Sequence, residues 1–490
     1  MNSKQLNDAL GQIDARYLEQ ADRYRKRRPW RRWGALAAAL ALVALGVFAL
    51  SRAHRAAVPP DDGVILGGTV QRLAAAQRPE AVPYPDVNAY QSDAAFDRAL
   101  EAWSASRRER ALAYAGDYAP PIDGFLARST QQFLSGAGGE NRVYAPKNVY
   151  LALAMLAETA GGETRQQLLS LLGADSMEAL RANAKALWNR NYLDDGTVTS
   201  VMAASLWLRE GAAYDADTLA VLAEDYYADS FSGEMGSPEL DRALQSWLDA
   251  NTDGLLGEQA NAQRLDDETV FALATTVCFR GKWDWQFSAD ANTQDLFHSP
   301  SGDVAAVFMH HREQKTVYYW GEHFAAVGQS FENFGGTMWF LLPDEGVSVD
   351  ELLADEEAMR FLTTADRWRS WEQQRFLRVN FSVPKFDVVS DLDLADGLRA
   401  LGVTDAFDPT RADLSSLTSA SPVWVSAVRH DARVVIDEEG CVAAAFTLIP
   451  APGEPPPPEE LVDFTLDRPF LFCITGEDGL PLLTGVVNHP

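Results

Sequence analysis

Cysteine is scarce in this chain of 490 residues, which contains only Cys278, Cys441 and Cys473. Three cysteines cannot form a disulfide framework, and none has metal-ligand spacing, so we interpret them as small apolar filler. The seven histidines are scattered along the chain. The sequence also lacks a G-x-S-x-G elbow, an H-E-x-x-H helix and a P-loop. We therefore expect no metal site and no cofactor, and a function other than catalysis.

Positive charge is the second shortage. There are 42 Lys and Arg residues against 70 Asp and Glu residues, which gives a formal net charge of -28. Such an acidic surface repels nucleic acid and argues against DNA or RNA as a partner. The charge is also uneven, because residues 1–33 hold nine basic and four acidic residues, a balance of +5, and the rest of the chain therefore carries -33.

An uncharged apolar run follows this basic segment. Residues 34–50 contain no charged or strongly polar side chain, and at about 1.5 Å per residue such a helix just crosses a hydrocarbon core of about 30 Å. Basic residues are more numerous before the run than after it, so the positive-inside rule keeps residues 1–33 cytoplasmic. We predict a signal-anchor helix at 34–51 in a single-pass protein of the cell membrane, with its body outside. The alternative is a cleaved signal peptide and a secreted protein.

The remaining chain divides near residue 121. Prolines punctuate residues 52–121, where 92–114 has helical periodicity, and we interpret this stretch as a spacer with one helix that holds the body off the membrane. Helices and strands are then interleaved without a repeat. Helical faces are expected at 125–134 and 149–172, and strands at 198–207, 269–279, 336–342, 377–383, 423–428 and 470–474. This pattern predicts an α+β domain at 122–490 with large, mainly antiparallel sheets.

The most informative segment begins at Val434. An apolar strand runs into an acidic turn that ends at Gly440, and an extended chain with a marked alternation follows. One side of that chain would carry Cys441, Ala443, Ala445 and Thr447, and the other Val442, Ala444, Phe446 and Leu448. The first set is small and uncharged and can enter a crowded core. The prolines that begin at Pro450 exclude a helix or a central strand. The sequence thus predicts an insertion-ready strand tethered to an exposed loop.

These residues resemble the serpin family of serine protease inhibitors. Glu438-Glu439-Gly440 with Ala443-Ala444-Ala445 is similar to the serpin hinge, and 467–472 and 485–488 are similar to the end of that family. Further similar segments occur in the family's order at 141–146, 152–156, 161–173, 205–207, 279–283, 341–345, 383–386, 401–407 and 412–415. The resemblance covers 122–490. It implies about eight to nine helices, an exposed reactive-centre loop at about 440–466, and an inhibitor rather than an enzyme.

The resemblance also implies a suicide mechanism. A serine or cysteine protease outside the cytoplasm attacks the loop and forms an acyl-enzyme, and the cut loop then enters the central sheet as a new strand, as serpin loops do. About ten inserted residues at about 1 kcal/mol per ladder hydrogen bond supply about 10 kcal/mol. Pro450 and Pro452 lack ladder donors, so insertion is expected to stall near Ile449. We expect a monomer with a protease partner; the alternative is a non-inhibitory surface binding or structural module.

Site residues follow from the same resemblance. The implied hinge comprises Glu438, Glu439, Gly440, Cys441, Val442, Ala443, Ala444, Ala445 and Thr447, with Cys441 where Thr or Ser is usual and Val442 where an acid is common. Family spacing places the cleaved bond between Glu454 and Pro455. Because proline at that position hinders most serine proteases, Leu448, Glu459 and Leu461 are further candidates. The implied sheet-opening region comprises Ala145, Asn148, Thr275, Trp283 and His430, in which Ala145 and Asn148 replace usual serines and Thr275 a usual asparagine.

Overall fold

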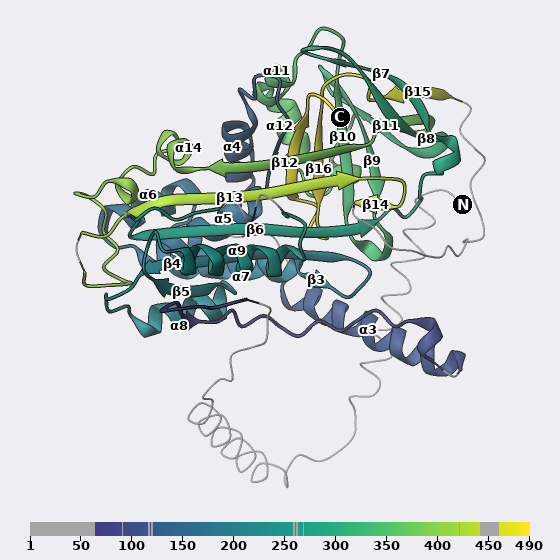
Figure 1. The fold of residues 1–490 in the computed structure, drawn as a ribbon. Helices are drawn as coiled ribbons and strands as arrows, with labels where there is room; N and C mark the ends of the chain where they lie inside the picture. The colour runs from purple at the N-terminus through teal and green to yellow at the C-terminus, as the bar shows by residue number, and fades with distance from the viewer. Residues whose placement is uncertain are drawn as a thin grey trace, which may run out of the picture. The chain divides into compact units, whose positions relative to one another are not determined.

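The computed structural model describes residues 64–90, 92–115, 118, 121–257, 260, 263–267, 269–420, 422–441 and 460–490. No helix in these ranges combines the length and hydropathy that crossing a bilayer requires. The predicted membrane helix at 34–51 lies outside the described residues, as does most of the predicted loop. The described chain forms two large β-sheets with helices packed on them (Figure 1).

Most of the long helices lie in the first half of the described chain, interleaved with strands. The α-helices are α3 (Asp93–Ala113), α4 (Asp123–Leu134), α5 (Pro146–Thr159), α6 (Gly162–Leu172), α7 (Met177–Asn191), α8 (Ala216–Asp225), α9 (Pro238–Thr252), α11 (Val349–Ala354), α12 (Glu356–Thr363), α13 (Arg367–Ser370) and α14 (Ala395–Ala400). Short 3-10 turns are η1 (Val87–Ala89), η2 (Ala289–Ala291), η3 (Glu332–Phe334) and η4 (Asp405–Phe407). The described residues from 123 onward thus contain ten α-helices rather than eight or nine. The four from α11 to α14 have eight residues or fewer, which is too short for a clear helical period.

The first sheet has eight strands. Its order is β1 (Gln71–Ala74), β5 (Asp229–Gly233), β4 (Thr199–Arg209), β6 (Phe271–Lys282), β14 (Gly440–Cys441), β13 (Val425–Ile436) and β12 (Phe386–Asp393), and β3 (Leu193–Asp194) pairs with β4. The pairs β4–β5 and β6–β13 are parallel, and the other pairs are antiparallel.

The second sheet has nine strands. Its order is β15 (Leu461–Thr465), β11 (Gln374–Pro384), β8 (Gly302–Trp320), β9 (Phe324–Ser330), β10 (Thr337–Pro343), β16 (Phe470–Thr475), β17 (Pro481–Val487) and β2 (Arg142–Tyr144), and β7 (Thr293–Ser299) pairs with β8. One of its pairs, β11–β15, is parallel. All six predicted strands are present, and the α+β class with mainly antiparallel sheets is confirmed.

The two faces of the first sheet are covered by different helices. Helix α5 is buried along its whole length and contacts β4 and β6 as well as β17 of the second sheet. Its run of Val, Leu, Ala and Met residues is apolar all round, as expected for a helix buried between layers. Helix α9 packs through Leu244 and Trp247 with Trp207 and Ala272 in a separate apolar cluster. The first sheet therefore lies between two helical layers.

The predicted spacer at 52–121 differs in the structure. The helix expected at 92–114 is present as α3, but residues 64–90 and 92–115 pack on the body rather than standing apart from it. Strand β1 pairs with β5 at the edge of the first sheet, and Trp103 of α3 is buried and donates to Asp195. Prolines suggested a linker, yet an extended proline-rich chain is also suited to cover an open sheet edge. Periodicity could not reveal a four-residue strand.

Candidate functional site

The candidate site lies where β6 and β13 stop pairing with each other. Their parallel ladder ends at the pair Thr276 and Asp431. Beyond that point β14 pairs with both strands, since Cys441 lies opposite Gly281 of β6 and Ile436 of β13. Between these two levels no ladder pair among the described residues joins 277–280 to 432–435. Figure 1 shows β6 (teal) and β13 (yellow-green) side by side, with β14 at the end toward which both arrows point.

The two strands keep one register across this interval. Asp431 lies 155 positions after its ladder partner Thr276. Gly281 and Ile436 both pair with Cys441, and they too are 155 positions apart. A strand that continued β14 would therefore be in register with both neighbours at every level. To accept such a strand, β6 and β13 have to separate but need not slide along each other.

The turn before β14 is held by its own aspartate. Asp437 Oδ1 accepts hydrogen bonds from the backbone N–H groups of Glu439 (2.9 Å) and Gly440 (3.1 Å), the usual way in which Asp stabilises a turn. Gly440 is required here, because a Cβ atom would lie 2.3 Å from the carbonyl oxygen of Gly281. Cys441 is buried, and burial raises the pKa of its thiol to about 12.

Trp283 binds this turn from the end of β6. Its indole N–H donates to the carbonyl oxygen of Asp437 (2.9 Å), and its backbone N–H donates to that of Glu439 (3.0 Å). The indole is fully buried and stacks on Phe331 at a centroid distance of 4.9 Å. Two hydrogen bonds therefore fix the start of the hinge to the end of β6, and the stack on Phe331 holds the indole that donates one of them.

Glu438 connects the hinge to the second sheet. Its carboxylate lies 2.6 Å from the ammonium of Lys385 and accepts a hydrogen bond from the Asn292 amide (2.5 Å). Burial alone would raise the pKa of Glu438, but these partners outweigh it and the pKa is lowered. The side chain is thus an ionised anchor for the start of the loop.

A buried polar cluster joins β6 and β13 lower in the sheet. His430 Nε2 accepts a hydrogen bond from the backbone N–H of Ala145 (3.0 Å), so the ring proton is on Nδ1 and faces Thr275 Oγ1 at 3.1 Å. Burial lowers the pKa of His430 to about 3, which keeps the imidazole neutral. Asn148 of α5 donates to the carbonyl oxygen of Thr276 (2.9 Å), whereas its buried Oδ1 has no hydrogen-bond partner among the described residues.

The structure brings together part of the residue set expected from the sequence. Ala145, Asn148, Thr275 and His430 meet at the β6–β13 ladder, and Trp283 lies at the hinge with Glu438, Glu439, Gly440 and Cys441. The other expected residues lie outside the described part of the chain: Val442, Ala443, Ala444, Ala445, Thr447, Leu448, Glu454, Pro455 and Glu459. Leu461 begins β15 and pairs with Arg378 of β11.

Sequence reasoning missed several residues that hold the hinge. Asp437 carried a usable signal, because Asp three positions before Gly is typical of a turn. Phe331, Lys385 and Asn292 carried none, since only the tertiary fold brings Lys385 and Asn292 to Glu438 and Phe331 to Trp283.

Comparison with known proteins assigns this architecture. The sequence model of a family described as "Serpin (serine protease inhibitor)" matches residues 123–490. The chain belongs to the serpin family. "Alpha-1-antiproteinase S" of Cavia porcellus is 29% identical to this serpin over 369 residues, covering 71% of this chain and 85% of the relative. "Leukocyte elastase inhibitor" of Homo sapiens is 27% identical over 374 residues, covering 75% and 97%. These relatives are named as protease inhibitors, not as enzymes.

Solved serpin structures share the fold. Tengpin, described as a thermophilic serpin in the native state, matches with a TM-score of 0.67 and 24% identity over 75% of this chain and 93% of its own. Arabidopsis AtSerpin1 in the native stressed conformation matches with a TM-score of 0.63 and 24% identity over 75% and 96%. Human thyroxine-binding globulin complexed with its ligand matches with a TM-score of 0.65 and 20% identity over 75% and 98%.

Proposed function

We propose that this serpin is a suicide inhibitor of an extracytoplasmic serine or cysteine protease. After cleavage, residues from Val442 onward would continue β14 and enter between β6 and β13. One observation carries this proposal: β14 already pairs with both strands, and beyond it no described ladder pair joins β6 to β13 until Thr276 and Asp431. Edge groups of two strands that share a register are suited to accept a third strand.

The side-chain alternation of the loop supports this proposal. If the register of β14 continues, Ala443 lies level with Phe279 and Val434, and Ala445 lies level with Val277 and Ala432. All four of these neighbours are buried in the main core cluster. Between two such strands only a small side chain fits without displacing packed neighbours. The alanines predicted to face the core thus match the crowding on that face.

The polar cluster gives Thr447 a specific role in this proposal. In the same register Thr447 lies level with Thr275 and His430, whose mutual contact now closes the sheet. Insertion would break that contact and place the Thr447 hydroxyl between the two side chains. Insertion would also bring the Thr447 hydroxyl, a hydrogen-bond donor, toward Asn148. The Oδ1 atom of Asn148 is buried and has no partner among the described residues. We propose that the cluster is a latch that Thr447 replaces.

The ladder at the other end of the loop supports a cleaved bond before Glu460. Leu461 pairs in parallel with Arg378, and the Arg378 backbone N–H donates to the carbonyl oxygen of Glu460 (3.1 Å). A protease binds its substrate as an extended strand, which a residue already in a ladder cannot readily provide. This favours the candidates before Glu460, and we retain Glu454–Pro455 as the bond that family spacing indicates.

Incubation with serine and cysteine proteases of differing specificity tests the proposed function. We expect at least one protease to form a covalent complex that survives boiling in detergent. The mass of the released C-terminal peptide then identifies the cleaved bond. Clean cleavage of the loop by every protease that cuts it, with no covalent complex, would refute inhibition.

The alternative of a non-inhibitory binding or structural module is favoured by one feature. Pro450 and Pro452 would lie at the lower end of the inserted strand, where each lacks a ladder donor. A loop that inserts only as far as Ile449 would carry the protease a shorter distance. This alternative predicts that cleavage leaves thermal stability unchanged.

We also propose that residues 34–51 anchor the protein in the cell membrane, with the serpin domain outside. The uncharged run and the basic residues that precede it support this proposal. The full chain should then sediment with membranes and resist carbonate extraction. Recovery of a secreted form whose N-terminus follows residue 51 would show a cleaved signal peptide instead.

A further inference from the structure

Residues 64–90 and 92–115 form a segment that we name the clasp. Its first half is bonded to the β5 edge of the first sheet. Strand β1 pairs with β5. On either side of β1, the Ile65 N–H donates to Ser246 of α9 (2.8 Å), and Arg78 donates to Asn251 of the same helix (2.7 Å). Val70 is buried among the residues that join α9 to the sheet. The first half of the clasp is therefore part of the β5–α9 unit.

Helix α3 carries the clasp across to the start of β4. The Trp103 indole is 7% exposed and donates to the buried Asp195 carboxylate (3.0 Å). Asp195 also accepts hydrogen bonds from the backbone N–H groups of Thr197 and Val198, so it fixes the turn that leads into β4. The Tyr84 backbone N–H donates to the Asp195 carbonyl oxygen (2.7 Å). Asp195 therefore receives hydrogen bonds from α3 and from the chain before it, and the two donors are held together by the edge-to-face contact of the Tyr84 and Trp103 rings.

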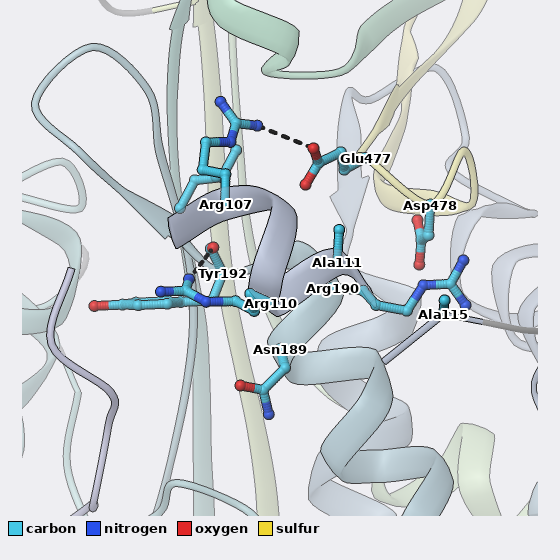
Figure 2. A pocket seen from close by; sticks show the side chains of 10 residues that line it. Arg107, Arg110, Ala111, Ala115, Asn189, Arg190, Tyr192, Glu477 and Asp478 are labelled. Carbon is cyan, nitrogen blue, oxygen red and sulfur yellow. Dashed lines mark hydrogen bonds and ion pairs between the residues drawn. The ribbon is translucent and has the colours of Figure 1, made fainter. Parts of the chain in front are cut away.

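The next turn of α3 is bonded to the second sheet. Arg107 donates to the carbonyl oxygen of Asn333, in the β9–β10 connection (2.5 Å), and pairs with Glu477, in the β16–β17 turn (3.1 Å). Figure 2 shows Arg107 reaching Glu477 across a pocket of about 290 Å³ between α3 and α7, while Arg110 lies over the Tyr192 ring and donates to its carbonyl oxygen. The Arg107 side chain is 15% exposed.

Loop insertion has to divide the first sheet between β6 and β13. Strands β5, β4 and β6 form one ladder and would move together. Strands β12 and β13 are bonded at β2 of the second sheet and just after it, since Ser390 of β12 accepts from the Val143 N–H (2.8 Å) and His430 of β13 accepts from the Ala145 N–H. Strand β6 contacts the second sheet at its end, through the Trp283–Phe331 bridge and the bond from the Asp284 N–H to Ser330, so the rest of β6, with β4 and β5, has to move relative to that sheet. The clasp is bonded to the first group through β1 and to the second sheet through Arg107. Opening the sheet therefore strains or breaks the Arg107 contacts.

The Arg107 contacts also reach the hinge. The connection that contains Asn333 begins after Phe331, whose ring stacks on Trp283, and Trp283 holds Asp437 and Glu439. The Arg107 guanidinium further lies over the Trp103 ring at 5.1 Å, which orders the side chain for both of its partners. One continuous set of contacts thus joins the clasp to the point where the loop enters the sheet.

We propose that the clasp restrains opening of the β6–β13 ladder, so that its Arg107 contacts set how readily a strand inserts. This inference rests on the proposed function, because it requires a sheet that accepts a strand. Loss of the Arg107 contacts with Asn333 and Glu477 should lower the free-energy barrier to strand insertion. The decrease should equal the strength of one charge-assisted hydrogen bond and one partly exposed ion pair. We expect insertion to become about five- to thirtyfold faster.

The test uses the full chain and a synthetic octapeptide with the sequence of residues 442–449, VAAAFTLI. The protein is incubated with the peptide at a fixed temperature below its unfolding temperature. Protein that has taken up the peptide unfolds at a higher temperature, and the rate at which this fraction accumulates measures strand insertion. The variants are Arg107→Ala and Trp103→Phe, which keeps an aromatic ring but removes the bond to Asp195. The matched control is Arg108→Ala, since Arg108 is on the same helix and the variant changes charge equally.

The inference predicts faster insertion into Arg107→Ala and Trp103→Phe, and an unchanged rate for Arg108→Ala. It is overturned if the two clasp variants insert peptide at the wild-type rate while their own unfolding temperatures fall, since the contacts are then merely structural. It is also overturned if Arg108→Ala accelerates insertion equally, because net charge would explain the effect. Failure of the peptide to enter any form, wild type included, would instead refute the proposed function itself.

Discussion

Asp431 occupies the last ladder pair between β6 and β13, and its environment makes that pair sensitive to pH. The residue is 1% exposed, accepts a hydrogen bond from Gln263 (3.0 Å), and lies directly opposite Asp391 of β12. Burial, followed by the Asp391 charge, raises the pKa of Asp431 to about 7, although Arg429 and Gln263 act in the other direction. A carboxyl group at this level of the sheet is therefore partly protonated at neutral pH.

We predict that Asp431→Asn stabilises the protein in a pH-dependent way. Because the folded pKa lies above the unfolded value, stability from this group is complete below about pH 4 and is lost as pH rises through about 7, by up to about 4 kcal/mol. Asparagine keeps an acceptor for Gln263 without the charge. The variant should therefore unfold at a higher temperature than wild type at about pH 8, with a gap that narrows toward about pH 4.5.

Comparison with wild type at each pH separates Asp431 from His430, which acts with the opposite sign. The folded pKa of His430 is lowered to about 3 by burial, so its contribution is lost as pH falls below the unfolded value near 6.5. Both proteins retain that contribution, and it cancels in the difference. A gap that does not change with pH would contradict the role given to Asp431.

Strand β14 and the residues after it form the element on which the proposed inhibition depends. We predict that Ala443→Glu and Val442→Glu, which place one carboxylate at adjacent positions, have opposite outcomes. If the β14 register continued on insertion, position 443 would lie between the buried Phe279 and Val434, whereas position 442 would lie between the partly exposed Arg280 and Val435. An unpaired carboxylate buried between two strands costs several kcal/mol, about 3 or more.

The measurement is the fraction of cleaved serpin that remains in covalent complex with a protease that wild type inhibits. Ala443→Glu should be cut as a substrate with at least about a tenfold loss of complex, since slower insertion gives the acyl-enzyme time to hydrolyse. Val442→Glu should stay within about twofold of wild type, because on insertion its side chain would face away from the buried side of the sheet. Equal loss in both variants would mean that the alternation does not govern insertion.

At the scale of elements, sequence patterns predicted the long apolar strands. They missed a short strand and the contacts between residues that are far apart in the sequence. Strands β4, β6 and β13 have 11 or 12 residues, and their apolar runs marked them. Strand β1 has four residues and exists because β5 offers an open edge, which no local pattern records. The contact of Lys385 with Glu438 and that of Phe331 with Trp283 could not be predicted either, since in each pair the two residues are far apart in the sequence.

At the scale of the whole molecule, the account requires that the intact fold is not the most stable arrangement of the chain. The eight residues 442–449 would gain about eight ladder hydrogen bonds and would bury the alanine face, which together are worth about 10 kcal/mol. A typical domain has a total stability of about 5–15 kcal/mol. Insertion would therefore change the stability of the entire body, not only of the loop.

The clasp and the latch both raise the free energy needed to separate β6 from β13, and they do so from different parts of the molecule. The latch of Thr275 and His430 closes the ladder from within, and the clasp resists separation of the two halves from outside. Family resemblance predicted the latch residues from the sequence. It could not predict the clasp, because the matched family region begins at residue 123, after α3.

Thermal unfolding before and after a single cut between residues 442 and 459 tests the central claim most directly. If the severed strand enters between β6 and β13, the cut protein should unfold at a temperature higher by roughly 20 °C or more, because about 10 kcal/mol is gained. An unfolding temperature that stays the same or falls after the cut would show that the sheet accepts no further strand, and would contradict the account.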